Sequence, residues 1–218
     1  MRIIEYPAID FALNVSEFIF QEWKELSNKK DKVFIGLSGG STPIPILTLL
    51  SEKELPWEKF YFFIVDERIV EASSEQSNFG NIFRAFFSKV PCHYYPMLSN
   101  LDGLEDEATK YSMLLKKELP LNNGNIPVFD QILLGMGDDG HVASLFGNSK
   151  AIAEAKRIVV SNFIEKFNSH RLTFTFPLLN SSRSNVLIFK GLEKRHIFDK
   201  LSSEYPVSKL KTDFVLHS

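Results

Sequence analysis

The sequence is poor in cysteine, with Cys92 as its single example in 218 residues. One thiol excludes an internal disulfide and a cysteine-based zinc cluster, and it is typical of a protein from a reducing compartment. The chain also lacks an uncharged apolar run of about 18 residues, which a membrane-spanning helix requires. Its start, MRIIEYPAID, lacks the apolar core of a cleavable signal peptide. We therefore expect a cytoplasmic protein.

The sequence also lacks an excess of charge of either sign. It has 25 Lys and Arg and 27 Asp and Glu, for a formal net charge of −2. This balance provides no long-range attraction to nucleic acid or to an anionic membrane, so neither is an expected partner. Any anion-binding site must be built locally. With 44% hydrophobic and 24% charged residues, the composition is that of a globular chain. The length is sufficient for one large domain, residues 1–218.

Compact apolar runs of strand length alternate with amphipathic segments of helical spacing. The expected strands are 3–6, 33–37, 60–65, 129–134, 157–160, 172–176, 186–189 and 214–216. The expected helices are about 11–28, 43–50, 78–88 and 105–119, with a short helix after His141. This alternation predicts an α/β fold with a mostly parallel, twisted sheet and helices on both faces.

The most informative stretch is 129–146, FDQILLGMGDDGHVASLF. An expected strand leads into three glycines, which permit the tight backbone needed where a strand end approaches a ligand. His141 then follows Asp138 and Asp139, so a titratable base lies beside carboxylates that can orient it. A solvated turn with capping residues is the alternative interpretation of the same pattern.

A second polar segment, SGGSTP at 38–43, follows the strand 33–37. Backbone N–H groups, hydroxyls and the start of a helix together suit a phosphate or carboxylate. The candidate ligands are Ser38, Gly39, Gly40, Ser41 and Thr42. The segment is not a P-loop, because no Gly-Lys-Ser/Thr follows. A glycine turn in which Ser or Thr caps the helix is the structural alternative.

Two other motifs compete for the same residues. Residues 36–40 fit the nucleophile-elbow pattern GxSxG, which would make Ser38 and His141 the centre of a serine hydrolase. Residues 135–140 fit the dinucleotide pattern GxGxxG. We reject the dinucleotide interpretation because Asp138 and Asp139 would face the pyrophosphate, where a helix start should offer only donors.

Asp66 and Arg68 follow the strongly apolar strand 60–65, which favours an inward-facing role over a solvated charge cluster. In parallel sheets, ligands bind beyond the carboxyl ends of the strands. The three polar clusters at 38–42, 66–68 and 135–141 therefore predict one shared pocket. The placement of Arg171 and Lys194 depends on strand direction. We expect no metal and no other cofactor, because no second histidine stands at ligand spacing from His141.

Taken together, these motifs resemble those of the 6-phosphogluconolactonase family, a branch of the group that includes glucosamine-6-phosphate isomerases and deaminases. The matching segments are LSGGSTP, PWEKFYFFIVDERIV, SN at 77–78, FDQILLGMGDDGHVASLF, RLTFTFPLL at 171–179 and GLEK at 191–194. The deaminase branch runs toward Asn-Glu-Pro after the histidine, but Leu145, Phe146 and Gly147 stand here. Asp138 and Gly147 replace prolines common in the lactonase branch, and we expect the added carboxylate to favour a protonated His141.

The resemblance implies a modified Rossmann-like fold (NagB/RpiA/CoA transferase-like). It also implies hydrolysis of 6-phospho-D-glucono-1,5-lactone to 6-phospho-D-gluconate, in the oxidative pentose phosphate route. His141 would activate water and Asp139 would orient it. Substrate and its phosphate would be bound by Ser38, Gly39, Gly40, Ser41, Thr42, Asp66, Arg68, Gly137, Arg171 and Lys194. A deaminase-like enzyme and a non-catalytic sugar-phosphate sensor remain as alternatives. The expected partner is the small lactone, and the expected assembly is a monomer or homodimer.

Overall fold

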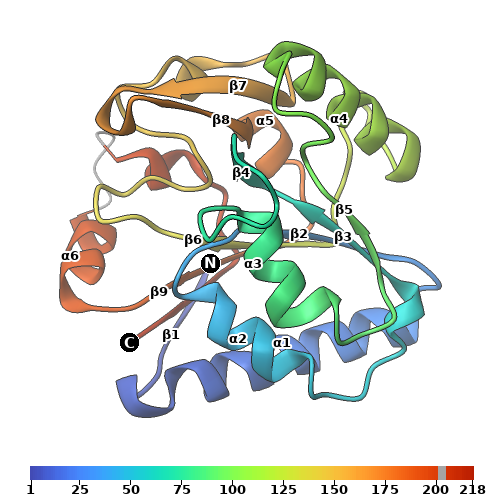
Figure 1. The fold of residues 1–218 in the computed structure, drawn as a ribbon. Coiled ribbons are helices and arrows are strands. Elements are labelled where there is room, and N and C mark those ends of the chain that lie inside the picture. The colour runs from blue at the N-terminus through green and yellow to red at the C-terminus, as the bar shows by residue number, and fades with distance from the viewer. Residues whose placement is uncertain (201–204) are drawn as a thin grey trace.

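The computed structural model describes residues 1–200 and 205–218, and a seven-stranded sheet lies at its centre (Figure 1). The strand order is β1-β10-β9-β6-β2-β3-β5, and every pairing is parallel. The bounds are β1 Arg2–Glu5, β10 Phe214–His217, β9 Asn185–Phe189, β6 Gln131–Gly135, β2 Val33–Leu37, β3 Phe60–Ile64 and β5 His93–Tyr95.

The central strands are apolar along their whole length because both faces of this sheet are covered. All five residues of β2 (VFIGL) and all five of β9 (NVLIF) are buried, as expected for a parallel sheet. Helices α1 (Phe11–Lys29) and α2 (Pro43–Leu50) lie below the sheet (Figure 1). Trp23 of α1 is fully buried, and its indole N–H donates to Gln131 of β6 at 2.9 Å.

A second, smaller sheet lies above the first (Figure 1). It consists of three antiparallel strands in the order β4-β8-β7, with α4 and α5 on the same side of the molecule. The bounds are β4 Asp66–Arg68, β8 Ser169–Phe174, β7 Val159–Ile164, α3 Asn78–Ile82, α4 Leu104–Glu118, α5 Phe176–Leu179 and α6 Leu192–Lys200. A π-helical turn spans Phe83–Phe87, and 3-10 turns span Ala8–Asp10, Trp57–Lys59, Lys150–Ala153, Glu165–Phe167 and Pro206–Lys209.

The expected α/β fold with a mostly parallel sheet is confirmed, and several local expectations are corrected. The apolar runs at 157–160 and 172–176 belong to the antiparallel sheet. The connection expected at 91–96 contains β5, and the helix expected at 78–88 is α3 followed by the π-helical turn. The short helix expected after His141 is wrong. Val142 instead forms isolated bridges with Met136 and Leu145, so this segment is a series of turns.

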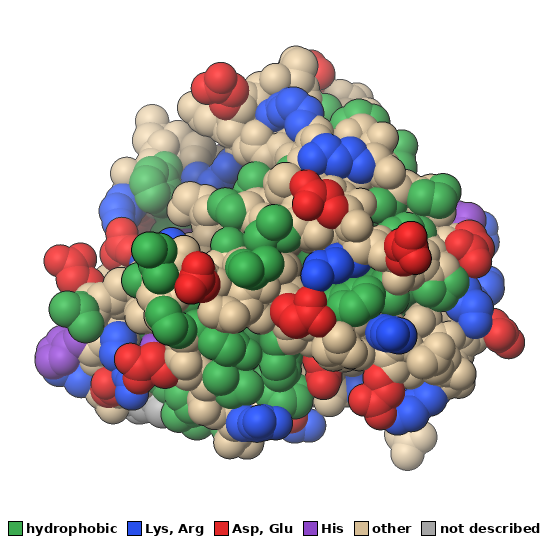
Figure 2. Space-filling view, turned by 90° about the horizontal axis from the view of Figure 1, so that it is seen from below, with side chains coloured by type: hydrophobic (Ala, Val, Ile, Leu, Met, Phe, Trp, Pro, Cys, Tyr) green, Lys and Arg blue, Asp and Glu red, His purple; other side chains and the backbone are tan. Residues whose placement is uncertain are grey.

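The face built by α1 and α2 carries acidic and basic side chains interspersed with apolar ones (Figure 2). Glu17 of α1 forms an ion pair with Lys53, which follows α2, with an N–O distance of 2.8 Å. Within residues 1–200 and 205–218, no helix combines the length and the apolar character that crossing a membrane would demand.

Candidate active site

The order of the strands places the polar segments side by side. β9, β6, β2 and β3 are consecutive neighbours in the sheet, so the residues that follow their carboxyl ends meet at one edge. A pocket of about 170 Å³ lies there. Its walls include all of the substrate-binding residues expected from the sequence: Ser38, Gly39, Gly40, Ser41, Thr42, Asp66, Arg68, Gly137, Arg171 and Lys194. His141 also lines it, and Asp139 lies behind His141.

The imidazole of His141 is held on three sides. Its Nδ1 is hydrogen-bonded to Oδ1 of Asp139. The ring of Phe146 stacks on one face, with 4.0 Å between ring centroids. Gly137 is so close to the ring that a Cβ added there would lie 2.0 Å from Cε1 and 2.1 Å from Nδ1. Since Asp139 occupies Nδ1, Nε2 is the nitrogen that can exchange a proton with a ligand.

The Asp139 carboxylate is suited to orienting this imidazole. Partial burial raises its pKa, but hydrogen bonds and the charge of His141 outweigh burial and lower the pKa to about 2. The carboxylate is therefore ionised at neutral pH and accepts the Nδ1 proton. The second aspartate, Asp138, has Lys194 as its recorded ion-pair partner, at 3.4 Å. The expected effect of the Asp138 carboxylate on His141 remains a prediction.

The turn that carries His141 is closed by its own backbone. The N–H of Gly137 donates to the carbonyl of His141 at 2.9 Å, and the N–H of Gly140 donates to the carbonyl of Gly137 at 3.1 Å. Gly140 has φ of 73°, a conformation that favours glycine. Ala143 also has a positive φ, 52°, which is uncommon for a residue with a side chain. Such outliers cluster at functional sites.

Arg68 and Arg171 are directly opposite each other in the β4–β8 ladder. Like charges in this position are destabilising. In the part of the chain that the structure describes, Nε of each is buried without a hydrogen-bond partner. Burial, followed by the charge of Arg68, lowers the pKa of Arg171. Arg68 also donates from Nη1 to the carbonyl of Gln76. Two partly buried guanidinium groups, each with an unused Nε donor and both lining one pocket, suit an anion with several oxygens.

The segment 38–42 has a backbone suited to close approach. A Cβ at Gly39 would lie 2.2 Å from Oδ1 of Asn78, so only glycine fits beside this amide. The structural alternative for this segment was a Ser or Thr side chain that caps the helix. Thr42 is the N-cap residue of α2, but its side chain makes no capping hydrogen bond among the described residues. The Ser38 hydroxyl donates to Asp66 at 3.4 Å. A serine nucleophile would instead need a hydrogen bond to His141.

The pocket lining includes residues that were not expected from the sequence, among them Asn78, Ser144 and Phe146. Asn78 donates from Nδ2 to the carbonyl of Asp66 at 2.7 Å. Ser144 donates its hydroxyl to the carboxylate of Asp66, also at 2.7 Å. Phe146 was interpreted only as an apolar position of a helix. The pair Ser77-Asn78 in a polar loop was the available signal for Asn78, whereas nothing local distinguishes Ser144.

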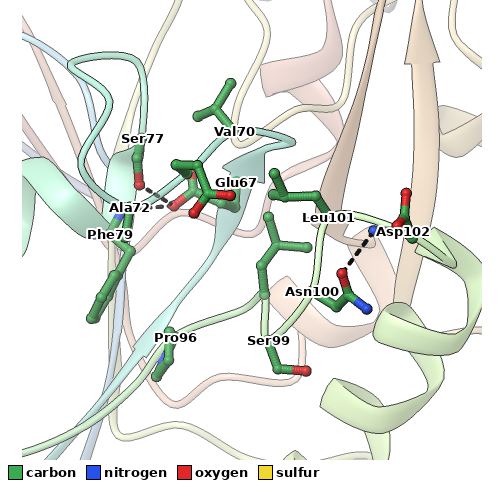
Figure 3. Close-up of a pocket in the computed structure, with 12 residues that line it drawn as sticks. Glu67, Val70, Ala72, Ser77, Phe79, Pro96, Ser99, Asn100, Leu101 and Asp102 are labelled. Atoms are coloured by element: carbon green, nitrogen blue, oxygen red, sulfur yellow. Dashed lines mark hydrogen bonds between the residues drawn. The ribbon is translucent and has the colours of Figure 1, made fainter.

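A second cavity, of about 450 Å³, is lined by Glu67 among other residues (Figure 3). Glu67 is 2% exposed and accepts hydrogen bonds from the backbone N–H groups of Asn78 and Phe79 and from the Ser77 hydroxyl. Burial raises its pKa. This larger cavity contains Glu71 and Asp102 but neither His141 nor an arginine. We therefore assign the candidate active site to the smaller pocket, where the base and the cations meet.

Clusters of at least three His, Cys, Asp or Glu side chains arranged to hold a metal are not found among residues 1–200 and 205–218. The expectation of no metal and no other cofactor remains a prediction.

Known proteins resemble this chain in both sequence and fold. A 6-phosphogluconolactonase from Synechocystis is 37% identical over 77% of this chain and 70% of its own. One from Thermotoga maritima is 31% identical over 94% of this chain and 89% of its own. The crystal structure of a Thermotoga maritima 6-phosphogluconolactonase superposes with a TM-score of 0.89 at 27% identity, covering 100% of this chain and 99% of that one. The family model described as glucosamine-6-phosphate isomerases/6-phosphogluconolactonase matches residues 8–216. The chain therefore belongs to the glucosamine-6-phosphate isomerase/6-phosphogluconolactonase family.

Proposed function

We propose that this protein is a 6-phosphogluconolactonase, a hydrolase that converts 6-phospho-D-glucono-1,5-lactone to 6-phospho-D-gluconate in the oxidative pentose phosphate route. The observation that carries the proposal is the placement in one pocket of an Asp-oriented imidazole and two arginines, whose buried Nε atoms have no hydrogen-bond partner among the described residues. The first group suits activation of water, and the second suits the phosphate. The names of the relatives at 31–37% identity support the same activity.

The chemistry begins at Nε2 of His141, which takes a proton from a water molecule while the oxygen of that water attacks the lactone carbonyl. A tetrahedral intermediate forms, and backbone N–H groups of the glycine-rich turns are suited to stabilise its oxyanion. When the intermediate collapses, the bond from the carbonyl carbon to the ring oxygen breaks. The imidazolium returns its proton to that oxygen, which becomes a hydroxyl of the open-chain acid. Asp139 keeps the imidazole oriented throughout and offsets its positive charge.

The phosphate is assigned to Arg68 and Arg171, because their unused Nε donors are buried and their mutual repulsion is relieved by a dianion. Lys194 and segment 38–42 line the same pocket and are available for the remaining oxygens and hydroxyls. Asp66 holds the hydroxyls of Ser38 and Ser144, so its role is to shape the pocket as well as to meet a substrate hydroxyl.

The test is the loss of purified lactone with time, measured against its spontaneous hydrolysis. We expect His141→Ala to lower kcat by about 10²–10⁴-fold, the usual contribution of a positioned base. We expect Arg171→Ala to raise KM roughly ten- to a hundredfold, because a charged contact is worth about 1.5–3 kcal/mol. His170→Ala is the matched control, since its imidazole contacts Ser161 at 3.2 Å outside the pocket. Near-full activity of His141→Ala would overturn the mechanism.

The alternatives give different results in the same experiments. A deaminase would release ammonia from glucosamine 6-phosphate, but the positions that carry its acid hold Leu145, Phe146 and Gly147, and the first two of these side chains are buried. A serine hydrolase would be labelled at Ser38 by a serine-directed phosphonate, and we expect no label. A sugar-phosphate sensor would bind 6-phosphogluconate without turning over the lactone.

A further inference from the structure

The tip of the β7–β8 hairpin reaches back to the candidate active site. It consists of the 3-10 turn Glu165–Phe167 and Asn168, whose φ of 45° reverses the chain. Phe167 is 48% exposed, yet its ring contacts two residues that line the pocket. The guanidinium carbon of Arg171 lies 5.3 Å from the ring centroid. The ring of Phe146 meets Phe167 at 5.9 Å and an angle of 75°, an edge-to-face contact.

These contacts link the two halves of the proposed chemistry. Phe146 stacks on His141 at 4.0 Å, so its edge-to-face contact with Phe167 supports the ring that holds the base. Arg171 lies on Phe167, so the same side chain supports the cation assigned to the phosphate. Lys166, the preceding residue, adds a weak contact to Asp139, with Nζ and Oδ2 separated by 3.9 Å.

We propose that Phe167 is a positioning residue, which keeps Arg171 directed into the pocket and buttresses Phe146 against His141. This inference deepens the proposed lactonase function and rests on it. The need for such a support follows from the free protein. Arg171 faces Arg68 across the ladder, and its Nε has no partner among the described residues. Repulsion would therefore favour rotation of the guanidinium toward solvent, where water satisfies its donors. The ring face of Phe167 opposes that rotation by a cation–π contact.

The two contacts predict two separable effects. Loss of the cation–π contact should weaken phosphate binding by roughly two- to thirtyfold, the range such contacts cover between exposed and desolvated sites. Loss of the edge-to-face contact should lower kcat by roughly two- to tenfold, through looser packing of Phe146 on the imidazole. The first effect requires a substrate phosphate. The second should also appear with glucono-1,5-lactone, which has no phosphate.

The experiment compares Phe167→Ala with Phe163→Ala as a matched control. Phe163 is on the same hairpin and is 44% exposed. Its ring packs on His170 at 5.0 Å, and neither Phe163 nor His170 lines the pocket. We expect Phe167→Ala to raise KM for the phosphorylated lactone about tenfold and to lower kcat severalfold, with Phe163→Ala changing each by less than about twofold. Phe167→Tyr keeps the ring face and edge, so it should restore both values.

Binding of 6-phosphogluconate, measured by calorimetry, separates this inference from the proposed function. Phe167→Ala should weaken it about tenfold even if the protein does not turn over the lactone. Equal behaviour of Phe167→Ala and Phe163→Ala in both assays would overturn the role of Phe167. Binding by Phe167→Tyr as weak as that of Phe167→Ala would overturn the role of Phe167 as well. After either result, lactone hydrolysis by the wild-type protein would still support the proposed function.

Discussion

Gly137 offers the sharpest test of the proposed base, because one methyl group there would compete directly with the imidazole. Gly137 is not among the residues with positive φ, so alanine suits its backbone. The added Cβ, however, would lie 2.0 Å from Cε1 of His141. Non-bonded carbon atoms normally stay 3.5–4.0 Å apart, so the ring would have to move by about 1.5 Å. Phe146 stacks on the ring and limits movement toward that face, and movement away from Asp139 breaks the contact with its carboxylate.

The expected size of the effect follows from this displacement. A misplacement of about 1 Å at a reacting group can cost about 10²-fold. The whole contribution of a positioned base is about 10²–10⁴-fold. We therefore expect Gly137→Ala to lower kcat at least about 10²-fold, close to the loss in His141→Ala. Thermal stability should change little, because a Gly→Ala change in a compatible conformation restricts the unfolded chain and offsets part of the strain.

The assay is lactone consumption, with Gly135→Ala as the control. At Gly135, two residues earlier, an added Cβ would meet its nearest atoms at 3.9 and 4.0 Å, ordinary van der Waals contact. The control therefore adds the same methyl group to the same glycine-rich segment without touching the imidazole, and its kcat should fall by less than about tenfold. The reasoning is refuted if Gly137→Ala keeps kcat within about threefold of the wild type, or if both variants lose activity equally.

Two further predictions concern the aspartates beside His141. Asp138→Asn removes a largely exposed carboxylate 3.4 Å from Lys194 and so leaves this pocket lysine available to the substrate. Exposed ion pairs contribute about 0–1 kcal/mol, so KM for the lactone should fall by up to about fivefold at low salt. A rise in KM would contradict the pairing. The pKa of Asp139 is lowered to about 2, so its stabilising contribution should be present above the unfolded-state pKa of about 4 and decline as the pH falls toward 2. Urea unfolding of wild type and Asp139→Asn between about pH 6 and pH 3 measures this, and a difference that grows on acidification would contradict the sign.

The sequence was sufficient for six of the seven strands of the central sheet, with β5 missed, and for most of the pocket. The runs in β2, β3 and β6 are long, apolar and bounded by glycine or charge, which fixes their type. Each is followed by a polar cluster, and the rule for parallel sheets then places the clusters at one edge. The grouping of the expected ligands in a single cavity follows from that rule and from strand order. The individual roles of these residues remain predictions.

The small antiparallel sheet was beyond such reasoning. β4 has only three residues, and its partner β8 is about one hundred positions later in the chain. Neither run carries a turn signal that reveals antiparallel pairing, so the opposition of Arg68 and Arg171 was not predictable. The short helix expected after His141 failed for a related reason. Three apolar residues are too few to define a helical period, and the bridges of Val142 to Met136 and Leu145 override it.

The proposed base follows a strand of the large sheet, and the proposed phosphate ligands are in the small sheet, so the geometry of the proposed reaction depends on how the two sheets are joined. Ser144, three residues after His141, makes that connection to all three strands of the small sheet. Its hydroxyl donates to Asp66 of β4, its N–H donates to Thr173 of β8 at 3.1 Å, and its carbonyl accepts from Asn162 of β7 at 2.8 Å. Each of these groups is buried, where a lost partner is costly. The turn with the imidazole is thereby fixed relative to Arg68 and Arg171. Repulsion between those two cations destabilises the free protein, and a bound phosphate relieves it. Under the proposed assignment, the same arrangement that lowers stability without ligand would therefore increase affinity for a phosphorylated substrate.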